Sequence, residues 1–381
     1  MATASIDWSN EVRYSRAQSM KVTTARLALS LLIAVSCLLA SSVRAADDEN
    51  QSLLNPLPIR DQFLLNNGFY FFEPEAAQVL PAESWVVDLH TADSNTFAKS
   101  AWVSRSLEGE TSRMNGAQTL SSERYRDLDS IFLVDGQTHR ATLSLKHGFG
   151  SSFQAAVSVP VSTIGGGWSD GMIEGFHNLL GLGNAERESL RQNSETVFIR
   201  TRTSSYIRER SANAAIGDIA LSGKYELRTL EDRDLAVSLA GAIELPTGDA
   251  RTLDGSGSVD AGLQLIATRE FRSGRVHGSV GVLRLGANGP LGTRPILVIT
   301  DTVSASHLIT EKTSATGQLT VSESPFRKMG VAEFTRRSYQ LSVGLQHLFG
   351  GTLAYAGFIE NVLTFQNSAD VGFTWGLSRR F

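Results

Sequence analysis

DVGFTWGLSRRF, at residues 370–381, ends the chain and decides the fold that the sequence predicts. Apolar and aromatic residues alternate in it with small or polar ones, which is the period of a β-strand with one apolar face. At the end of a soluble protein, such a strand would offer an apolar edge to other chains. A strand that closes a barrel in a membrane has both edges paired and its apolar face against lipid. We therefore predict an all-β protein, a transmembrane antiparallel up-and-down β-barrel.

The same stretch resembles the C-terminal signal by which Gram-negative outer-membrane barrels are recognised for assembly. The resemblance implies the barrel-assembly machinery as a partner. Arg379 stands where that signal usually has an apolar residue, and its aliphatic stem lets the charge reach the membrane interface. The residues that we assign to this predicted signal are Phe373, Trp375, Leu377 and Phe381.

The period of two recurs from Trp85 onward. In residues 235–245, for example, leucine, valine and isoleucine alternate with alanine, serine and glutamate. Strands of about ten to fifteen residues exceed the globular average of about five or six and match tilted strands that cross a membrane. The predicted strands are 85–93, 123–135, 138–148, 152–162, 195–203, 214–228, 235–246, 257–270, 275–286, 297–310, 313–323, 336–348, 352–364 and 370–381.

The connections between these strands alternate in length. Short ones at 135–137, 231–233, 272–274, 311–312 and 349–351 alternate with mostly longer ones at 94–122, 204–213, 247–256, 287–296 and 324–335. Outer-membrane barrels have short periplasmic turns and longer outer loops, with an even number of strands. The pattern predicts about fourteen strands, with twelve as the other count, and places both chain ends on the periplasmic side.

The N-terminus indicates export. Lys21 and Arg26 precede an apolar run at 27–40, and small residues follow up to Ala45, after which we predict cleavage of a Sec signal peptide. Residues 1–45 are thus an extension and signal, with Met20 as an alternative start, and the destination is the outer membrane of a Gram-negative cell. The one cysteine lies within that segment, so the mature chain is predicted to have no disulfide.

Composition excludes one class of partner. Without residues 1–45, which hold five Lys/Arg and two Asp/Glu, the 35 Lys/Arg and 39 Asp/Glu of the chain become 30 and 37. That net charge of −7 is unlike the basic surface of a nucleic-acid-binding protein. The mean hydropathy of −0.08 fits either a soluble protein or a barrel whose two faces average out.

Two segments do not follow the barrel pattern. Residues 46–83 hold prolines and an aromatic cluster without clean alternation, and we predict a periplasmic or lumenal segment there. Residues 163–194 are an insertion in the predicted barrel, 84–381, in which apolar residues at helical spacing predict a short periplasmic helix. Both segments are candidate gates.

Four motifs carry a family resemblance. They are NPLPIRDQ at 55–62, FEPE at 72–75, IEGFH at 173–177 and IELPTGD with GSGSVD between 243 and 260. Together they resemble an uncharacterised family of Gram-negative outer-membrane proteins of unknown function. The last motif is also similar to outer-membrane transporters encoded with aromatic-degradation pathways. The resemblance implies outer-membrane placement and transport, and it brings no substrate, cofactor or catalytic residue.

Sites for metals or catalysis are weakly indicated. The Gly- and Asp-rich stretch at 246–257 has oxygen ligands that calcium prefers, but it lacks the spacing of a calcium loop, and a turn explains it as well. Glu174 and His177 share one face of the predicted helix, yet no further ligand stands nearby. We therefore predict no metal, no cofactor and no catalytic residue.

The polar faces of the strands are the better functional evidence. Side chains opposite the apolar ones are expected to line the lumen, where small and mixed-charge groups can hold water and pass a small solute. In a closed barrel the same charges would pair across the lumen. The candidate lumen-lining residues are Lys146, Lys224, Glu226, Arg228, Glu244, Gln264, Gln340 and Gln346.

The outside of the barrel should meet outer-membrane lipid and lipopolysaccharide. Arginines in an outer loop could bind lipopolysaccharide phosphates, and the candidates are Arg200, Arg202, Arg208 and Arg210. Three functions stay open in this order: a channel or facilitator for small molecules, a non-conducting structural barrel, and an outer-membrane hydrolase. The substrate and the oligomeric state do not follow from the sequence.

Overall fold

A computed structural model describes residues 52–107, 120, 128–181, 184, 186–202, 204–208, 214–230, 234–364 and 366–381. The predicted signal peptide, 1–45, lies outside the described residues. Within them, no helix is both long and apolar enough to span a bilayer.

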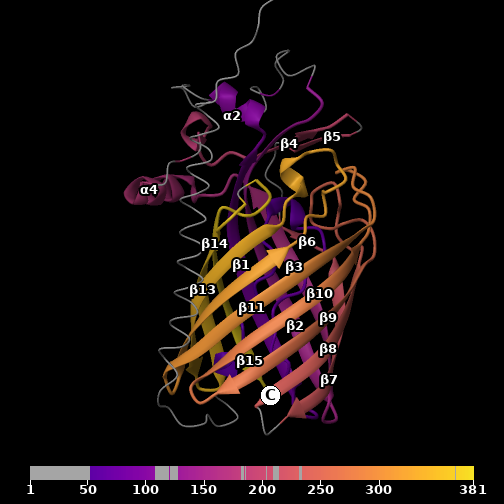
Figure 1. The fold of residues 1–381 in the computed structure, drawn as a ribbon, viewed down its shortest axis with the longest axis vertical. Coiled ribbons are helices and arrows are strands. Elements are labelled where there is room, and N and C mark those ends of the chain that lie inside the picture. Colours follow the sequence, from indigo (N-terminus) through magenta and orange to yellow (C-terminus); the bar gives the residue numbers. More distant parts are fainter. Residues whose placement is uncertain are drawn as a thin grey trace, which may run out of the picture.

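The described chain is mostly strand (Figure 1). The long strands are β1 (Trp85–Lys99), β2 (Ile131–Phe149), β3 (Phe153–Gly165), β7 (Ile219–Leu230), β8 (Leu235–Leu245), β9 (Asp260–Phe271), β10 (Gly274–Leu285), β11 (Ile296–Thr310), β12 (Thr313–Ser322), β13 (Ser338–Phe349), β14 (Thr352–Asn361) and β15 (Val371–Arg380). Shorter elements are β4 (Thr196–Arg200), β5 (Ser205–Arg208), β6 (Ala215–Ile216), α2 (Ala101–Leu107), α4 (Asp170–Leu180), η2 (Leu64–Asn66), η4 (Arg187–Ser189) and η6 (Glu333–Thr335).

The long strands close a ring. Each pairs antiparallel with its neighbour in sequence, and β15 returns to pair with β1 from Asn95↔Val371 to Val86↔Arg380. The up-and-down barrel is therefore confirmed, with twelve strands rather than about fourteen. β4, β5 and β6 belong to the same sheet but do not close the ring, because β4 pairs only with residues 131–135 of β2 and with β5.

One predicted turn is wrong, and it accounts for much of the difference in strand count. Residues 135–137 lie inside β2, which runs without interruption where two strands were expected. Instead of forming a turn, Gly136 and Gln137 contact other segments of the chain. Gly136 has Leu64 so close that an added Cβ would lie 3.1 Å from its Cδ1 atom, and Gln137 accepts hydrogen bonds from the backbone of Trp168 and Ser169.

The position predicted for the short helix is also wrong. α4 forms within the predicted insertion, but at the end of the barrel that carries the long connections and α2, opposite the C-terminus (Figure 1). Because 131–149 is one strand and not two, the connection after β3 falls on the long-loop side. By the usual layout of such barrels this is the outer side, not the periplasmic one.

The outer surface of the barrel is apolar. Side chains on alternate positions of the strands are exposed, and they include Leu143, Leu145, Leu221, Leu239, Leu263, Val280, Val303 and Leu345. Aromatic residues gather near the short turns, where Phe149, Phe153, Phe271 and Phe349 are exposed. An apolar band with aromatic residues at its rim is the lipid-facing surface of an outer-membrane barrel.

Candidate functional site

Residues 52–83 lie inside the barrel as a hairpin, which we call the plug. Leu53 and Leu54 pack on Leu308 and Leu353 at the short-turn end. Phe63 meets Phe326 and Phe334, which belong to the 323–337 connection at the opposite end, with ring centroids 6.3 and 6.2 Å apart. The chain then returns, and Glu83 bonds to the backbone of Gly148 at the base of β2. We call 53–65 the ascending leg and 70–80 the descending leg.

The ascending leg is held by uncharged side chains of the wall. Gln346 donates to the carbonyl of Asn55 at 2.7 Å, and Gln340 donates to the carbonyl of Arg60 at 3.1 Å. Gln340 also accepts from the N–H of Gln62 at 3.0 Å. Ser314 donates to the carbonyl of Leu53. The wall therefore recognises the backbone of this leg, while its apolar side chains are almost completely buried.

The tip of the hairpin is braced from within. The guanidinium of Arg60 donates to the carbonyls of Asn66 and Phe69, at 2.5 and 2.6 Å. Asp61 accepts from Asn66 at 2.9 Å and from the N–H of Phe63 at 3.0 Å. These bonds give the turn a defined shape although a single 3₁₀ turn, η2, is its only regular element among the described residues.

The descending leg meets charged side chains. Glu75 pairs with Lys224 at 2.8 Å, and Lys224 also donates to the carbonyl of Ala76 at 2.7 Å. Glu73 lies 2.8 Å from the ring nitrogen of His90. Further wall groups bind the backbone of this leg: Asp260 on Tyr70, Thr268 on Ala77, Glu226 on Val79 and Gln154 on Leu80.

The inner wall thus has two chemically different halves. Inward positions of β1, β2 and β7–β10 include the charged residues Asp88, Arg140, Lys146, Lys224, Glu226, Glu244, Asp260, Glu270 and Arg275. Inward positions of β11–β15 carry hydroxyl, amide, small and apolar groups, with Arg380 as the exposed last residue of β15. The plug lies between these halves. The descending leg faces the charged half, and the ascending leg faces mainly the uncharged half, with further bonds from His277 of β10 and Ser94 of β1.

The predicted lumen-lining residues have different surroundings. Lys224, Glu226, Gln340 and Gln346 bind the plug, as described above. Three others have other surroundings: Lys146 pairs with Asp88 at 2.7 Å, Gln264 donates to Ser279 at 3.0 Å, and Glu244 is buried. A bulge follows Glu226, and the side chain of Arg228 lies outside the described residues.

The wall residues that sequence reasoning missed include three that bind the plug. His90 contacts the Glu73 carboxylate, Ser338 donates to the Asp61 carboxylate, and Thr268 accepts from the N–H of Ala77. The signal that could have found them is the strand alternation itself, because all three stand at inward positions. Sequence reasoning singled out ionic and glutamine side chains and passed over hydroxyls. Of the four residues of the predicted assembly signal, Phe373, Trp375 and Leu377 point outward on β15 and Phe381 follows its last residue; all four are exposed.

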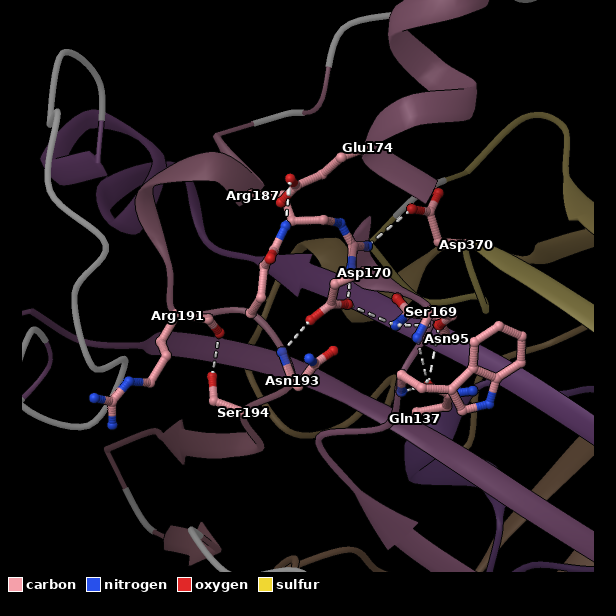
Figure 2. A network of polar contacts seen from close by, with 12 residues as sticks. Asn95, Gln137, Ser169, Asp170, Glu174, Arg187, Arg191, Asn193, Ser194 and Asp370 are labelled. Atoms are coloured by element: carbon pink, nitrogen blue, oxygen red, sulfur yellow. Dashed lines mark hydrogen bonds and ion pairs between the residues drawn. The ribbon is translucent and has the colours of Figure 1, made fainter. Parts of the chain in front are cut away.

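At the outer rim, a polar network fastens the 166–195 segment to the outside of the barrel (Figure 2). Arg187 donates to Asp170 and to Asp370, both at 3.0 Å. Asp170 also accepts from the side chain of Asn95 at 3.1 Å and from the N–H of Asn193 at 2.8 Å. Asn95 stands at an outward position of β1, so the network holds this segment outside the wall and not in the lumen.

The other candidates are engaged in local contacts. Arg208 is buried on Glu195, so it is not an accessible lipopolysaccharide contact, whereas Arg202 forms an exposed pair with Asp129. Asp254 accepts from Ser162 and from Thr252, both at 2.6 Å. Among the described residues, no group of three or more His, Cys, Asp or Glu is arranged to hold a metal ion. Arg210 and the side chain of His177 lie outside the described part.

Comparison with solved structures places this fold among outer-membrane channels. The COG4313 outer membrane channel from Pseudomonas putida F1 superposes with a TM-score of 0.51 at 10% identity, covering 82% of this chain and 100% of that one. The KdgM porin gives a TM-score of 0.38 at 7% identity, covering 78% and 99%. The first likeness shows the fold, and the second is too low to carry an argument.

Sequence comparison gives the family. A search of curated proteins found no match. The model of a family described as a protein of unknown function (DUF3187) matches residues 89–381, which is most of the barrel. The prediction of an uncharacterised family is therefore confirmed, and the chain belongs to this family of unknown function.

Proposed function

We propose that the protein is a plug-gated channel for small molecules in the outer membrane of a Gram-negative cell. The observation that carries the proposal is the plug itself, a hairpin that fills a barrel of channel fold and is held by side-chain contacts rather than by a sheet. The proposal includes export by the Sec signal at 1–45, insertion by the barrel-assembly machinery, and lipid and lipopolysaccharide around the barrel.

The energetics of the ascending leg permit movement. Burial of its seven large apolar side chains, at about 1.5–3 kcal/mol each, stabilises the plugged state by about 10–20 kcal/mol. Ordering thirteen residues opposes this by about 1–2 kcal/mol for each residue, about 13–26 kcal/mol in all. Because these terms are of similar size, the hydrogen bonds to the wall decide the balance, and such bonds contribute only about 1 kcal/mol each.

A non-conducting structural barrel is the second candidate. The observation that favours it is that the plug reaches from the short-turn end to the long-loop end and back, so the lumen is occupied along its length. A hydrolase would need a serine, a histidine and a carboxylate in one hydrogen-bonded chain. No such chain is found among the described residues.

A disulfide that ties the ascending leg to the wall separates the two candidates. Ser314 bonds to the carbonyl of Leu53. The one natural cysteine, Cys37, lies in the signal peptide that the proposal removes. The double variant Leu53→Cys/Ser314→Cys can therefore be oxidised and reduced cleanly. Proteoliposomes containing the mature chain are tested for swelling in small sugars, polyols and organic acids.

For a plug-gated channel, we expect swelling with the wild type and the reduced variant and its loss on oxidation. For a structural barrel, no solute should cause swelling in any state. Wild-type protein in moderate urea serves as the positive control, because the plug should unfold before the hydrogen-bonded barrel and leave an open pore. Equal swelling by the oxidised and reduced forms would show that the leg does not gate the path.

A further inference from the structure

We call the uncharged half of the inner wall, formed by β11–β15, the neutral wall. One row of polar side chains on it forms no hydrogen bond with the plug. Ser304, Gln318 and Ser342 stand side by side on β11, β12 and β13, because Ser304 is in register with Gln318 and Gln318 with Ser342. All three are buried, with exposures of 1%, 0% and 0%. The hydroxyl oxygens of both serines and both amide atoms of Gln318 have no hydrogen-bond partner among the described residues.

The rows on either side of it are occupied. In the next row toward the short turns, Ser306 bonds to Thr316 at 2.9 Å. Gln346, one row further along, donates to Thr316 at 2.9 Å and to the plug carbonyl of Asn55. In the row toward the long loops, Gln340 binds the plug at Arg60 and Gln62. The unused row therefore lies between two anchoring points of the ascending leg.

The sequence of the plug explains why the row is left unused. The stretch between these anchoring points is Pro56-Leu57-Pro58-Ile59. Proline has no N–H to donate, and the N–H of Ile59 already donates to the carbonyl of Leu57 at 2.8 Å. The side chains of Leu57 and Ile59 pack with Tyr355 and Ile359. This part of the plug has little to offer to an amide and two hydroxyls.

Buried polar groups without a protein partner are rare, and each calls for water, a ligand or another function. Here four such atoms form a donor and acceptor surface about two strand spacings wide, roughly 10 Å. No charged side chain stands at an inward position of the described strands β11–β14. A charged solute would lose hydration at this wall without gaining a counter-charge.

We propose that the row Ser304–Gln318–Ser342 is a binding subsite for small uncharged solutes that carry hydroxyl or amide groups. The inference rests on the proposed channel and deepens it, because the subsite lies where a solute would pass between the ascending leg and the neutral wall. Gln318, at the centre of the row, donates and accepts, and the two serine hydroxyls do either. The charged half of the lumen, behind the descending leg, stays engaged with the plug.

The test compares solutes of similar size and opposite polarity. Proteoliposomes with the full mature chain are challenged with xylitol and with its carboxylate counterpart xylonate over a range of concentrations. The variant Gln318→Leu keeps a similar volume and removes both amide atoms. Gln264→Leu, at an inward position of β9 on the charged half, is the matched control.

We expect the wild type to pass xylitol saturably and to pass xylonate more slowly. Loss of one hydrogen bond, at about 1 kcal/mol, should raise the half-saturating xylitol concentration about fivefold in Gln318→Leu. Gln264→Leu should leave it unchanged. Removing the unpartnered amide of Gln318 should not destabilise the fold, and the bond from Gln264 to Ser279 that the control loses is a single hydrogen bond. Both variants should therefore keep the heat-modifiable gel migration of the wild type.

The experiments distinguish an error in the proposed subsite from an error in the proposed channel. Equal half-saturating concentrations in wild type and Gln318→Leu, or xylonate that passes as fast as xylitol, would overturn the subsite while leaving a channel. If no solute passes, the channel proposal fails, and saturation-transfer NMR of the detergent-solubilised chain still tests the subsite. Xylitol contacts that vanish in Gln318→Leu would support it, and their absence in the wild type would refute it.

Discussion

Arg187 offers the sharpest test of how the outer rim is built. Its guanidinium is 3% exposed, bonds to two carboxylates at 3.0 Å each, and lies 4.5 Å from the ring centroid of Phe97. The substitution Arg187→Ala removes all three contacts at once. Asp170 then remains buried, with two neutral donors in place of a cation (Figure 2).

The expected cost follows from these contacts. Breaking a buried ion pair on one side costs about 3–5 kcal/mol, and the lower end applies here because Asp170 keeps two hydrogen bonds. About 3 kcal/mol corresponds to an increase of roughly 150-fold in the open population of the 166–195 segment. The loss should stay local, because this segment contributes no strand to the ring of twelve.

Limited proteolysis measures that population. A protease specific for glutamate can cut after Glu188, which is exposed within the segment. The variant Arg191→Ala is the matched control, since it removes an exposed arginine four residues away. Arg187→Lys should be intermediate, because one ammonium cannot reproduce the planar guanidinium whose two terminal nitrogens reach two different carboxylates.

The account of the rim fails if Arg187→Ala is cut no faster than Arg191→Ala. It also fails if the whole barrel loses its heat-modifiable migration, because the network would then hold the strands and not the segment. Partial recovery in the double variant Arg187→Ala/Asp170→Asn would identify the uncompensated carboxylate as the main source of the loss.

Three further predictions concern the plug and the outer loop. Lys224→Met should speed maleimide labelling of an Ala77→Cys reporter by about thirtyfold, which corresponds to about 2 kcal/mol for a buried pair whose partner Glu75 is partly exposed, while the exposed Lys312→Met should not. Gly148→Ala should lower the temperature of heat modification, since its Cβ would lie 2.2 Å from the carbonyl oxygen of Pro81 and overpacking costs about 1–3 kcal/mol; Gly278→Ala, with open space around it, should not. Calcium or EDTA should leave proteolysis of the 246–257 loop unchanged, because the Asp249 carboxylate is bonded to Arg251 and that of Asp254 to Ser162 and Thr252.

Much of the barrel could be predicted because the two faces of each strand require side chains of opposite polarity. Lipid selects apolar side chains on one face of each strand and the lumen accepts polar ones on the other, so a period of two sets the orientation. In β8, Ala236, Ser238 and Glu244 are buried while Leu239 and Ile243 are exposed, as the alternation predicts. The local pattern suffices because each strand meets the same two environments.

The wrong predictions lie where the conformation of a residue is set by contacts with a segment that is distant in the sequence. Residues 135–137 have the composition of a turn, but Gly136 makes room for Leu64 of the plug, and Gln137 anchors the segment before α4. Neither partner is near in sequence. Taking this stretch as a turn splits β2 and reverses the sense of the connection after β3, so one local misreading moves α4 to the wrong end.

The plug was beyond local patterns for the same reason. Its prolines and missing alternation mark residues 46–83 as unlike a barrel strand, but its place in the lumen depends on wall groups up to 291 residues away, as in the bond from Gln346 to Asn55. The sequence therefore left the periplasmic and lumenal positions open. The structure shows residues 52–83 within the lumen.

The asymmetry of the lumen indicates which part of the plug would move first. The descending leg is covalently continuous with β1 and is held by ion pairs and by backbone bonds to charged wall residues. The ascending leg begins at the short-turn end, and most of its bonds to the wall come from uncharged side chains such as Gln340 and Gln346, which are weaker than charge-assisted bonds. The bond from Ser338 to the Asp61 carboxylate is charge-assisted. Release of the ascending leg alone would uncover β11–β13, including Gln318, and leave the charged half covered. A gate of this kind opens onto an uncharged wall, which is why the choice of solute and the order of plug movement can be tested in the same vesicles.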